Sequence, residues 1–193
     1  MALTHLLYLH GFRSSPQSIK AQTMASRVRE RFGALHWWCP QLPPSPQEAM
    51  RQVGTHIADW PRESMAVIGS SLGGFYATAV AEQTGCKAVL LNPAVHPARD
   101  LARYVGEQTA WNDPSQTFYF QPQFVDELKA LETGELTAPE RYFAIIAKGD
   151  EVLDWREMTG RYAHARCKVL EGGDHALSDF EDHLPEIEEF LGL

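Results

Sequence analysis

The chain has 193 residues and a net charge of −8, and 44% of its residues are hydrophobic, which fits an acidic globular protein built from one domain. An acidic surface repels phosphate backbones, so the composition argues against a nucleic-acid-binding protein. No apolar run approaches the roughly 20 residues that a membrane-spanning helix requires, and the first residues lack a secretory pattern, so we predict a cytoplasmic protein.

Strand and helix patterns alternate through the first half of the chain. Short apolar runs predict strands over residues 6–9, 35–39, 65–68 and 87–91. Apolar residues at helical spacing predict helices that begin near residues 16, 46 and 71. The second of these helices has the clearest start, because Ser45 and Glu48 form a capping box with Pro46 at the first helical position.

The alternation is interrupted between about residues 96 and 140. This stretch has no clear strand pattern and mixes aromatic residues with polar ones and turn signals, so we predict a lid-like insertion made of short helices. The alternation then resumes, with strands predicted over residues 142–147 and 167–170 and a helix between them that begins near Asp154. The last helical segment contains Pro185, which is expected to break or kink it near Leu184.

Alternating helices and strands with nearly continuous apolar strands are typical of a parallel sheet covered by helices on both faces. The sequence therefore predicts an α/β fold, formed by residues 1–193 as one domain that includes the insertion. The carboxyl ends of parallel strands share one edge of the sheet, and ligands of open α/β sheets bind at that edge.

The most informative motif is Gly69-Ser70-Ser71-Leu72-Gly73, a G-x-S-x-G sequence between a predicted strand and a predicted helix. This context is that of a nucleophile elbow, in which small residues flank a serine on a tight turn. Ser71 is the candidate nucleophile, because Ser70 does not have glycine both two positions before it and two positions after it. The alternative is a glycine-rich strand-to-helix turn with no catalytic role. Candidate oxyanion donors, a candidate acid and a candidate base at other strand ends argue against it.

A second motif, His10-Gly11-Phe12, directly follows the first predicted strand. An acyl-transfer enzyme needs backbone N–H groups directed at the tetrahedral oxyanion, and one such donor is worth about 3–4 kcal/mol. Leu72, which follows the nucleophile, and Phe12 are the candidate donors. We expect the imidazole of His10 to shape this loop rather than to act as a base, and a plain strand-ending turn is the alternative.

Two further strand ends carry a candidate acid and a candidate base. Asp150 follows the fifth strand, where a carboxylate can orient a histidine and stabilise its imidazolium form. Asp154 is the alternative acid, but it suits the N-cap of the next helix. His175 is the candidate base, because it follows the nucleophile and the acid in the chain order that such triads have on this fold. His183 lies within a predicted helix.

The three cysteines form an odd and widely spaced set, which fits neither a disulfide framework nor a zinc site. Such cysteine usage is in keeping with a reducing cytoplasm. We expect no metal and no organic cofactor, because acyl transfer through an activated serine requires neither.

Together these motifs resemble those of the α/β-hydrolase superfamily and, more narrowly, of the YqiA-like group of small bacterial esterases. The narrower resemblance also rests on the blocks Ser14-Ser15-Pro16, Pro40-Gln41-Leu42-Pro43-Pro44, Asn92-Pro93-Ala94-Val95, Gly149-Asp150-Glu151-Val152-Leu153-Asp154 and Gly172-Gly173-Asp174-His175-Ala176. It implies that Ser71, Asp150 and His175 are catalytic. It also implies carboxylesterase activity on short acyl esters, and it leaves acyl-CoA thioesterase activity open.

On this resemblance we predict a minimal three-layer α/β-hydrolase fold, with a six-stranded parallel sheet in the order 2-1-3-4-5-6 and a small helical lid. The predicted partner is a small-molecule acyl ester or thioester, with no nucleic acid and no membrane. A serine peptidase, a lactone hydrolase and a non-catalytic binding protein on the same scaffold are the alternatives.

Residues that bind the substrate are predicted around the oxyanion loop and in the insertion. His10 and Gly11 belong to that loop, and Arg13 beside it either steers an anionic substrate or faces solvent. Either an acyl pocket or simple packing of the insertion accounts for its aromatic residues Trp111, Tyr119, Phe120 and Phe124.

Overall fold

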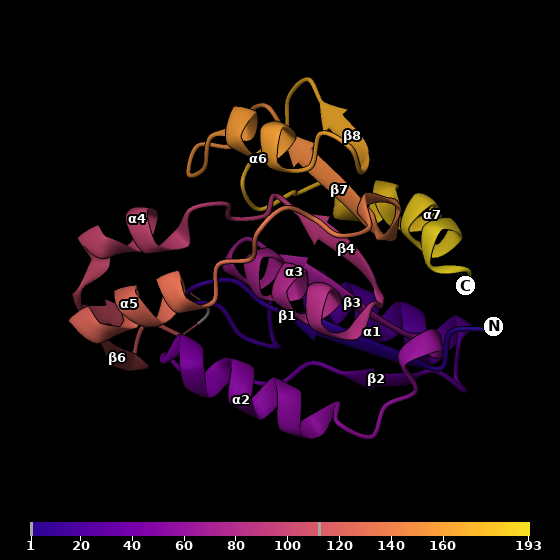
Figure 1. Ribbon diagram of the computed structural model, residues 1–193, viewed down its shortest axis with the longest axis horizontal. Coiled ribbons are helices and arrows are strands. Elements are labelled where there is room, and N and C mark those ends of the chain that lie inside the picture. Colours follow the sequence, from indigo (N-terminus) through magenta and orange to yellow (C-terminus); the bar gives the residue numbers. More distant parts are fainter. Residues whose placement is uncertain (1, 112) are drawn as a thin grey trace.

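A six-stranded parallel sheet forms the centre of the computed structural model, which describes residues 2–111 and 113–193 (Figure 1). Met1 and Asn112, which fall within the predicted domain and insertion, lie outside the described residues. The strands are ordered β2-β1-β3-β4-β7-β8, which confirms the predicted order because β7 and β8 are the fifth and sixth strands of this sheet along the chain. They are β1 (His5–Leu9), β2 (His36–Trp38), β3 (Met65–Ser70), β4 (Lys87–Leu91), β7 (Tyr142–Ala147) and β8 (Arg166–Leu170).

Helices cover both faces of this sheet and give the three layers that the alternating pattern predicts. The helices α1 (Ile19–Arg31) and α7 (Phe180–Leu191) pack on the face that carries Leu6 and Tyr8 of β1. The opposite face, which carries Leu7 and Leu9, is covered by α2 (Pro46–His56), α3 (Leu72–Thr84) and α6 (Trp155–Arg161). Because successive side chains of a strand point to opposite faces, β1 contributes to both cores.

Two helices show how local sequence sets these elements. Helix α2 begins as predicted at a capping box, where the Ser45 side chain accepts a hydrogen bond from Glu48 N at 3.1 Å. Helix α7, in contrast, runs through Pro185 as one helix, so of the expected break or kink near Leu184 the break does not occur. Pro185 lies in the second turn and removes one backbone donor, while the apolar face of α7 stays packed on the sheet, which accounts for its continuity.

The insertion lies at the end of the molecule opposite to both termini (Figure 1). It consists of α4 (Pro97–Leu101), an antiparallel hairpin of β5 (Gly106–Thr109) and β6 (Thr117–Phe120), and α5 (Pro122–Ala130). The expectation of short helices without a strand is therefore only partly correct. Both hairpin strands have only four residues. β5 (Gly-Glu-Gln-Thr) is polar and gives no strand pattern, and β6 (Thr-Phe-Tyr-Phe) is aromatic but too short to be distinguished as a strand from its sequence alone.

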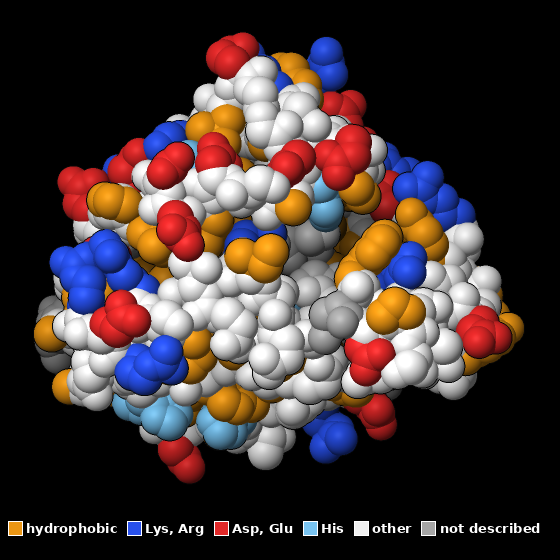
Figure 2. All heavy atoms as spheres, turned by 180° about the vertical axis from the view of Figure 1, so that it is seen from behind, with side chains coloured by type: hydrophobic (Ala, Val, Ile, Leu, Met, Phe, Trp, Pro, Cys, Tyr) orange, Lys and Arg blue, Asp and Glu red, His pale blue; other side chains and the backbone are white. Residues whose placement is uncertain are grey.

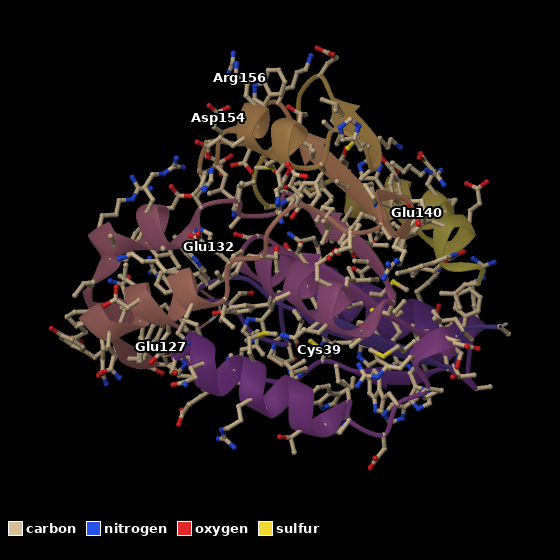
Figure 3. The ribbon with its side chains drawn as sticks, in the orientation of Figure 1. Cys39, Glu127, Glu132, Glu140, Asp154 and Arg156 are labelled. Carbon is tan, nitrogen blue, oxygen red and sulfur yellow. The ribbon has the colours of Figure 1, made fainter. Side chains whose placement is uncertain are left out.

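Side-chain bonds attach the insertion to the rest of the fold. Glu127 of α5 lies beside the start of α2, where its carboxylate accepts hydrogen bonds from the Ser45 hydroxyl at 2.6 Å and from Gln47 N at 3.1 Å (Figure 3). Arg99 of α4 also forms a bidentate ion pair with Glu157 of α6. The short 3₁₀ turns are Arg62–Ser64, Ala102–Tyr104 and Pro139–Arg141.

No helix in the described ranges is long and apolar enough to cross a membrane.

Candidate active site

Ser71 stands on a sharp turn between β3 and α3, with a backbone φ of 56° and ψ of −121°. A non-glycine residue rarely adopts a positive φ, and such strain persists only where the surroundings hold it. The turn is held on both sides, because Ser71 N donates to Leu91 O and Ala94 N donates to Ser71 O, each at 3.0 Å. A Cβ on Gly73 would lie 1.9 Å from Leu9 O, so only glycine allows α3 to approach β1 this closely. The G-x-S-x-G pattern thus has the strained elbow geometry that it predicts.

The side chains of Ser71, His175 and Asp150 form one hydrogen-bonded chain. Ser71 Oγ lies 2.9 Å from His175 Nε2, and His175 Nδ1 lies 2.7 Å from Asp150 Oδ2. The Asp150 side chain is fully buried, and its other oxygen accepts hydrogen bonds from Val152 N and Leu153 N, both at 2.8 Å. In this arrangement Nδ1 carries the proton towards the carboxylate, which leaves Nε2 free to accept the serine proton.

Asp154, the alternative acid, lies away from this chain. Its carboxylate accepts a hydrogen bond from Arg156 N at 2.9 Å and thereby caps α6. Figure 3 shows Asp154 and Arg156 together at the outer end of that helix. The structure therefore brings Asp150, and not Asp154, next to the histidine.

The loop that carries His175 is fixed by two residues that sequence reasoning missed. Asn92, at the end of β4, is buried, and its amide donates to Asp174 O at 2.9 Å and to His175 O at 3.3 Å. Its carbonyl oxygen accepts from Ala147 N at 2.8 Å. Glu151 accepts a hydrogen bond from His175 N at 3.0 Å. In the sequence, Asn92 stands out only as a polar residue directly after an apolar strand and as part of the Asn92-Pro93-Ala94-Val95 block, and neither feature indicates its contact with the histidine loop.

The loop after β1 lies against Ser71. A Cβ on Gly11 would be 3.1 Å from Ser71 Cβ and 3.6 Å from Ser71 Oγ, so the loop and the serine are in close contact. Within the described ranges, the backbone N–H groups of Phe12 and Leu72 donate no hydrogen bond. Leu72 is the first residue of α3, where a free N–H and the helix dipole favour a negative charge. Both groups are thus available as oxyanion donors.

His10 shapes this loop. Its Nε2 accepts a hydrogen bond from Leu42 N at 3.1 Å, and its Nδ1 lies 3.0 Å from Gly11 O. Burial lowers the pKa of His10, which keeps the ring neutral and able to accept that bond. The segment of residues 40–44 is thereby attached to the loop after β1 through one imidazole.

A cavity of about 500 Å³ opens beside Ser71 and His175. That volume lies within the range of small-molecule sites. Figure 2, which views the molecule from behind relative to Figure 1, shows a hollow bordered by hydrophobic side chains with basic side chains nearby. Its wall includes the predicted residues His10, Gly11, Phe12, Arg13, Leu72 and Trp111, together with Leu101, Tyr104 and Leu153.

Two predicted substrate-binding residues, Tyr119 and Phe120, do not line this cavity. Phe120 is buried and packs against Phe12, with ring centroids 5.2 Å apart, whereas Tyr119 is 60% exposed. They are neighbours on β6, so their side chains point to opposite sides of the strand. Phe124 is also buried against Phe120, so packing accounts for these two phenylalanines, whereas Tyr119 lies at the surface.

Arg13 joins the oxyanion loop to the hairpin of the insertion. Its Nε donates to Thr109 O, and its guanidinium stacks 4.0 Å from the centre of the Trp111 ring. Trp111 N in turn donates to Arg13 O at 2.8 Å. Arg13 is therefore held against the insertion rather than free in solvent, and it also lines the cavity; a role in steering an anionic substrate stays a prediction.

Within the described ranges, no group of three or more histidine, cysteine, aspartate or glutamate side chains is arranged to hold a metal ion. The three cysteines are free thiols, and burial raises the pKa of Cys39 to about 12.

The sheet order, the elbow and the three-layer packing define an α/β-hydrolase fold. Solved structures with this fold superpose over nearly the whole chain. A protein of Agrobacterium vitis S4 has a TM-score of 0.78 at 14% identity and covers 99% of this chain and 91% of its own. Mouse alpha/beta hydrolase domain-containing protein 10 has a TM-score of 0.73 at 15% identity, with coverages of 97% and 89%. A structure of the metagenome-derived lipolytic enzymes LipS and LipT has a TM-score of 0.71 at 16% identity, with coverages of 98% and 94%.

The chain belongs to the UPF0227 family, an uncharacterised protein family whose sequence profile matches residues 5–192. A UPF0227 protein of Vibrio parahaemolyticus is 22% identical over 188 residues, which are 96% of this chain and 98% of the relative. A UPF0227 protein of Yersinia pseudotuberculosis is 23% identical over 196 residues, with coverages of 97% and 99%. The resemblance to YqiA-like α/β hydrolases is thereby confirmed.

Proposed function

We propose that this protein is a serine hydrolase that cleaves small carboxylic esters through an acyl-enzyme intermediate. The observation that carries the proposal is the hydrogen-bonded chain from Ser71 through His175 to Asp150 at the wall of the cavity. A buried carboxylate, an imidazole and a serine in this order form an activated nucleophile.

In the first half-reaction, Ser71 Oγ attacks the carbonyl carbon of the ester while His175 Nε2 takes the hydroxyl proton. The carbonyl oxygen becomes an oxyanion, which the N–H groups of Phe12 and Leu72 stabilise. The tetrahedral intermediate then collapses, the carbon–oxygen bond to the alcohol breaks, and His175 gives its proton to the departing alkoxide. Ser71 is left as an acyl ester.

In the second half-reaction, water attacks this acyl ester and gives its proton to His175 Nε2. A second tetrahedral intermediate forms in the same oxyanion site and breaks to release the carboxylic acid, and the proton returns to Ser71 Oγ. Asp150 stays ionised throughout and stabilises the imidazolium that forms twice in each cycle. No step requires a metal or an organic cofactor.

The first experiment is labelling with a fluorophosphonate probe, read by intact mass and followed by peptide mapping. We expect one adduct, located on Ser71. Ser71→Ala should lose the adduct and all ester turnover, whereas Ser70→Ala, which removes the neighbouring hydroxyl, should keep a labelled serine. An adduct on Ser70, or turnover by a folded Ser71→Ala variant, would disprove the assignment.

A panel of short acyl esters, acyl-CoA thioesters and peptide anilides then separates the activities that share this triad. We expect ester hydrolysis and no release of anilide, because the insertion is small and the cavity has the size of a small molecule. A protein that binds no probe under conditions that label a control hydrolase would instead be a binding scaffold.

A further inference from the structure

One wall of the catalytic cavity carries polar groups that the proposed acyl transfer does not use. Tyr8 of β1, Ser18 at the start of α1 and Lys20 in its first turn line the same cavity as Ser71 and His175. They come from the side of the sheet that α1 covers, and the loop of His175 lies beside them, since Lys20 Nζ donates to Ala176 O.

Two of these groups are buried donors without a partner. The Tyr8 side chain has no solvent exposure, and within the described ranges its hydroxyl makes no hydrogen bond. Burial also raises the pKa of Tyr8, so its hydroxyl keeps its proton. The Ser18 hydroxyl is likewise buried and unpartnered in that part of the chain. Buried polar groups are nearly always hydrogen-bonded, so an unpaired pair beside a cavity indicates a ligand group that pairs with them.

The start of α1 offers backbone donors and the positive end of a helix dipole to a negative group. Helix α1 has 13 residues, its first turn holds no acidic residue, and its N-cap Ser18 makes no capping bond. The N-terminal N–H groups and the dipole of α1 therefore lack an anionic partner. Lys20 places a cation at this positive end of the helix, which is electrostatically unfavourable unless an anion binds between them.

The carboxylates nearest Lys20 accept hydrogen bonds from other groups. Asp150 is bonded to His175, Glu151 accepts from His175 N, and Asp174 accepts from Ser178. None of the carboxylates in the described ranges lies within 4.0 Å of Lys20 Nζ. Burial lowers the pKa of Lys20 to about 8, against the opposing effect of Asp174 and Asp150, so its ammonium form predominates at neutral pH.

We propose that Tyr8, Ser18 and Lys20 form a subsite that binds an anionic oxygen group of the substrate, a carboxylate or a phosphate. Lys20 supplies the charge, and the two hydroxyl groups donate hydrogen bonds to the oxygens. The inference rests on the proposed function, because it places the anion on the ester that Ser71 attacks. It defines the substrate class as acidic esters rather than neutral ones.

The test compares two esters that share one acyl chain. One is 4-nitrophenyl valerate, which ends in a methyl group, and the other is mono-4-nitrophenyl glutarate, which ends in a carboxylate. We expect the purified full chain to have a higher kcat/KM for the glutarate monoester. Lys20→Met should lower the ratio of the two kcat/KM values about tenfold or more, the loss that one hydrogen bond to a charged group produces.

Tyr8→Phe and Ser18→Ala keep the shape of the wall and should each lower the same ratio by a few-fold. Lys129→Met is the matched control, because Lys129 is exposed on α5 and pairs with Asp126 at the surface, and it should leave the ratio unchanged. A wild-type ratio of one or below would overturn the proposal. An equal loss for both esters in Lys20→Met would also overturn it, since Lys20 would then only hold Ala176 and the histidine loop.

Direct binding separates a failure of the subsite from a failure of the proposed function. If neither ester is hydrolysed, calorimetry with glutarate and with inorganic phosphate still tests the anion site in wild type and in Lys20→Met. Anion binding by the wild type that is lost in Lys20→Met would support the subsite. Tighter binding of glutarate than of phosphate, or the reverse, would then show which anion the subsite prefers. Absence of binding for both anions would overturn it.

Discussion

Replacing Asn92 with aspartate tests how the histidine loop is held. Asn92 is 1% exposed and joins three strand ends, because its oxygen accepts from Ala147 N while its amide donates to Asp174 O and His175 O. Aspartate has the same shape and keeps the acceptor for Ala147 N. A carboxylate has no hydrogen to donate, so it would face two carbonyl oxygens at the distance of a hydrogen bond.

The magnitude follows from these contacts. Two donated hydrogen bonds are lost at about 1 kcal/mol each, and leaving buried carbonyls unpaired adds to the loss, so we expect unfolding to become easier by about 2–4 kcal/mol at pH 7. In a chain of this length, 1 kcal/mol corresponds to roughly 2–4 °C in Tm. Because the same bonds position His175, kcat for ester hydrolysis should fall about tenfold or more, in keeping with the sensitivity of catalysis to small displacements.

The assay is urea unfolding and ester turnover as a function of pH. In its protonated form the introduced carboxyl group can donate one hydrogen bond, so burial among carbonyls raises its folded pKa above the unfolded value of about 3.9. The variant is then relatively most stable below that value, and its deficit grows as the pH rises through the folded pKa. Gln123→Glu introduces the same charge at an exposed position and serves as control. Wild-type stability and kcat in a folded Asn92→Asp variant would refute this account.

Three further predictions concern the site itself. Asp150→Asn should lower kcat about 10⁴-fold, whereas Asp154→Asn keeps a good helix cap and should leave kcat unchanged; the reverse result in steady-state assays would reassign the acid. Gly11→Ala should lower kcat/KM, because its Cβ would lie 3.1 Å from Ser71 Cβ and 3.6 Å from Ser71 Oγ, and unchanged kinetics would contradict that close approach. Burial lowers the pKa of His10, so the stability that its neutral ring contributes should be lost as the pH falls below about 6.5. The free energies of unfolding of wild type and His10→Gln, measured in urea, should therefore become equal in acid. A difference between the two proteins that stays constant with pH would contradict this prediction.

The arrangement of the sheet could be predicted because its strands are buried on both faces. In β3 all six residues are buried, and such a strand reads as a continuous apolar run. The candidate site follows from the same property, since its motifs stand directly after these runs and parallel strands bring their carboxyl ends to one edge. Ser71, Asp150 and His175 are therefore found together although up to 104 positions separate them in the chain.

The insertion and the supporting contacts could not be predicted in the same way. The β5–β6 hairpin is short, and its stability depends on contacts such as that of Phe120 with Phe12, which no local pattern reveals. Asn92 resembles any polar residue at the end of a strand until the loop of His175 is placed against it. Tyr8 has the appearance of a core aromatic residue, and only the cavity beside its hydroxyl distinguishes it from one.

The residues proposed for catalysis and the residues that shape the cavity come from different parts of the fold. The residues proposed for bond cleavage stand on ends of the central sheet, whereas the cavity wall opposite them comes from the insertion. Substitutions in the insertion should therefore alter which ester fits more readily than they alter the acyl-transfer chemistry. Arg13 is the exception, because it follows Phe12, the proposed oxyanion donor, and is hydrogen-bonded to Thr109 and Trp111 of the hairpin. Through that residue the position of the insertion is coupled to the oxyanion loop, so a change of the hairpin that breaks these bonds should affect kcat as well as KM.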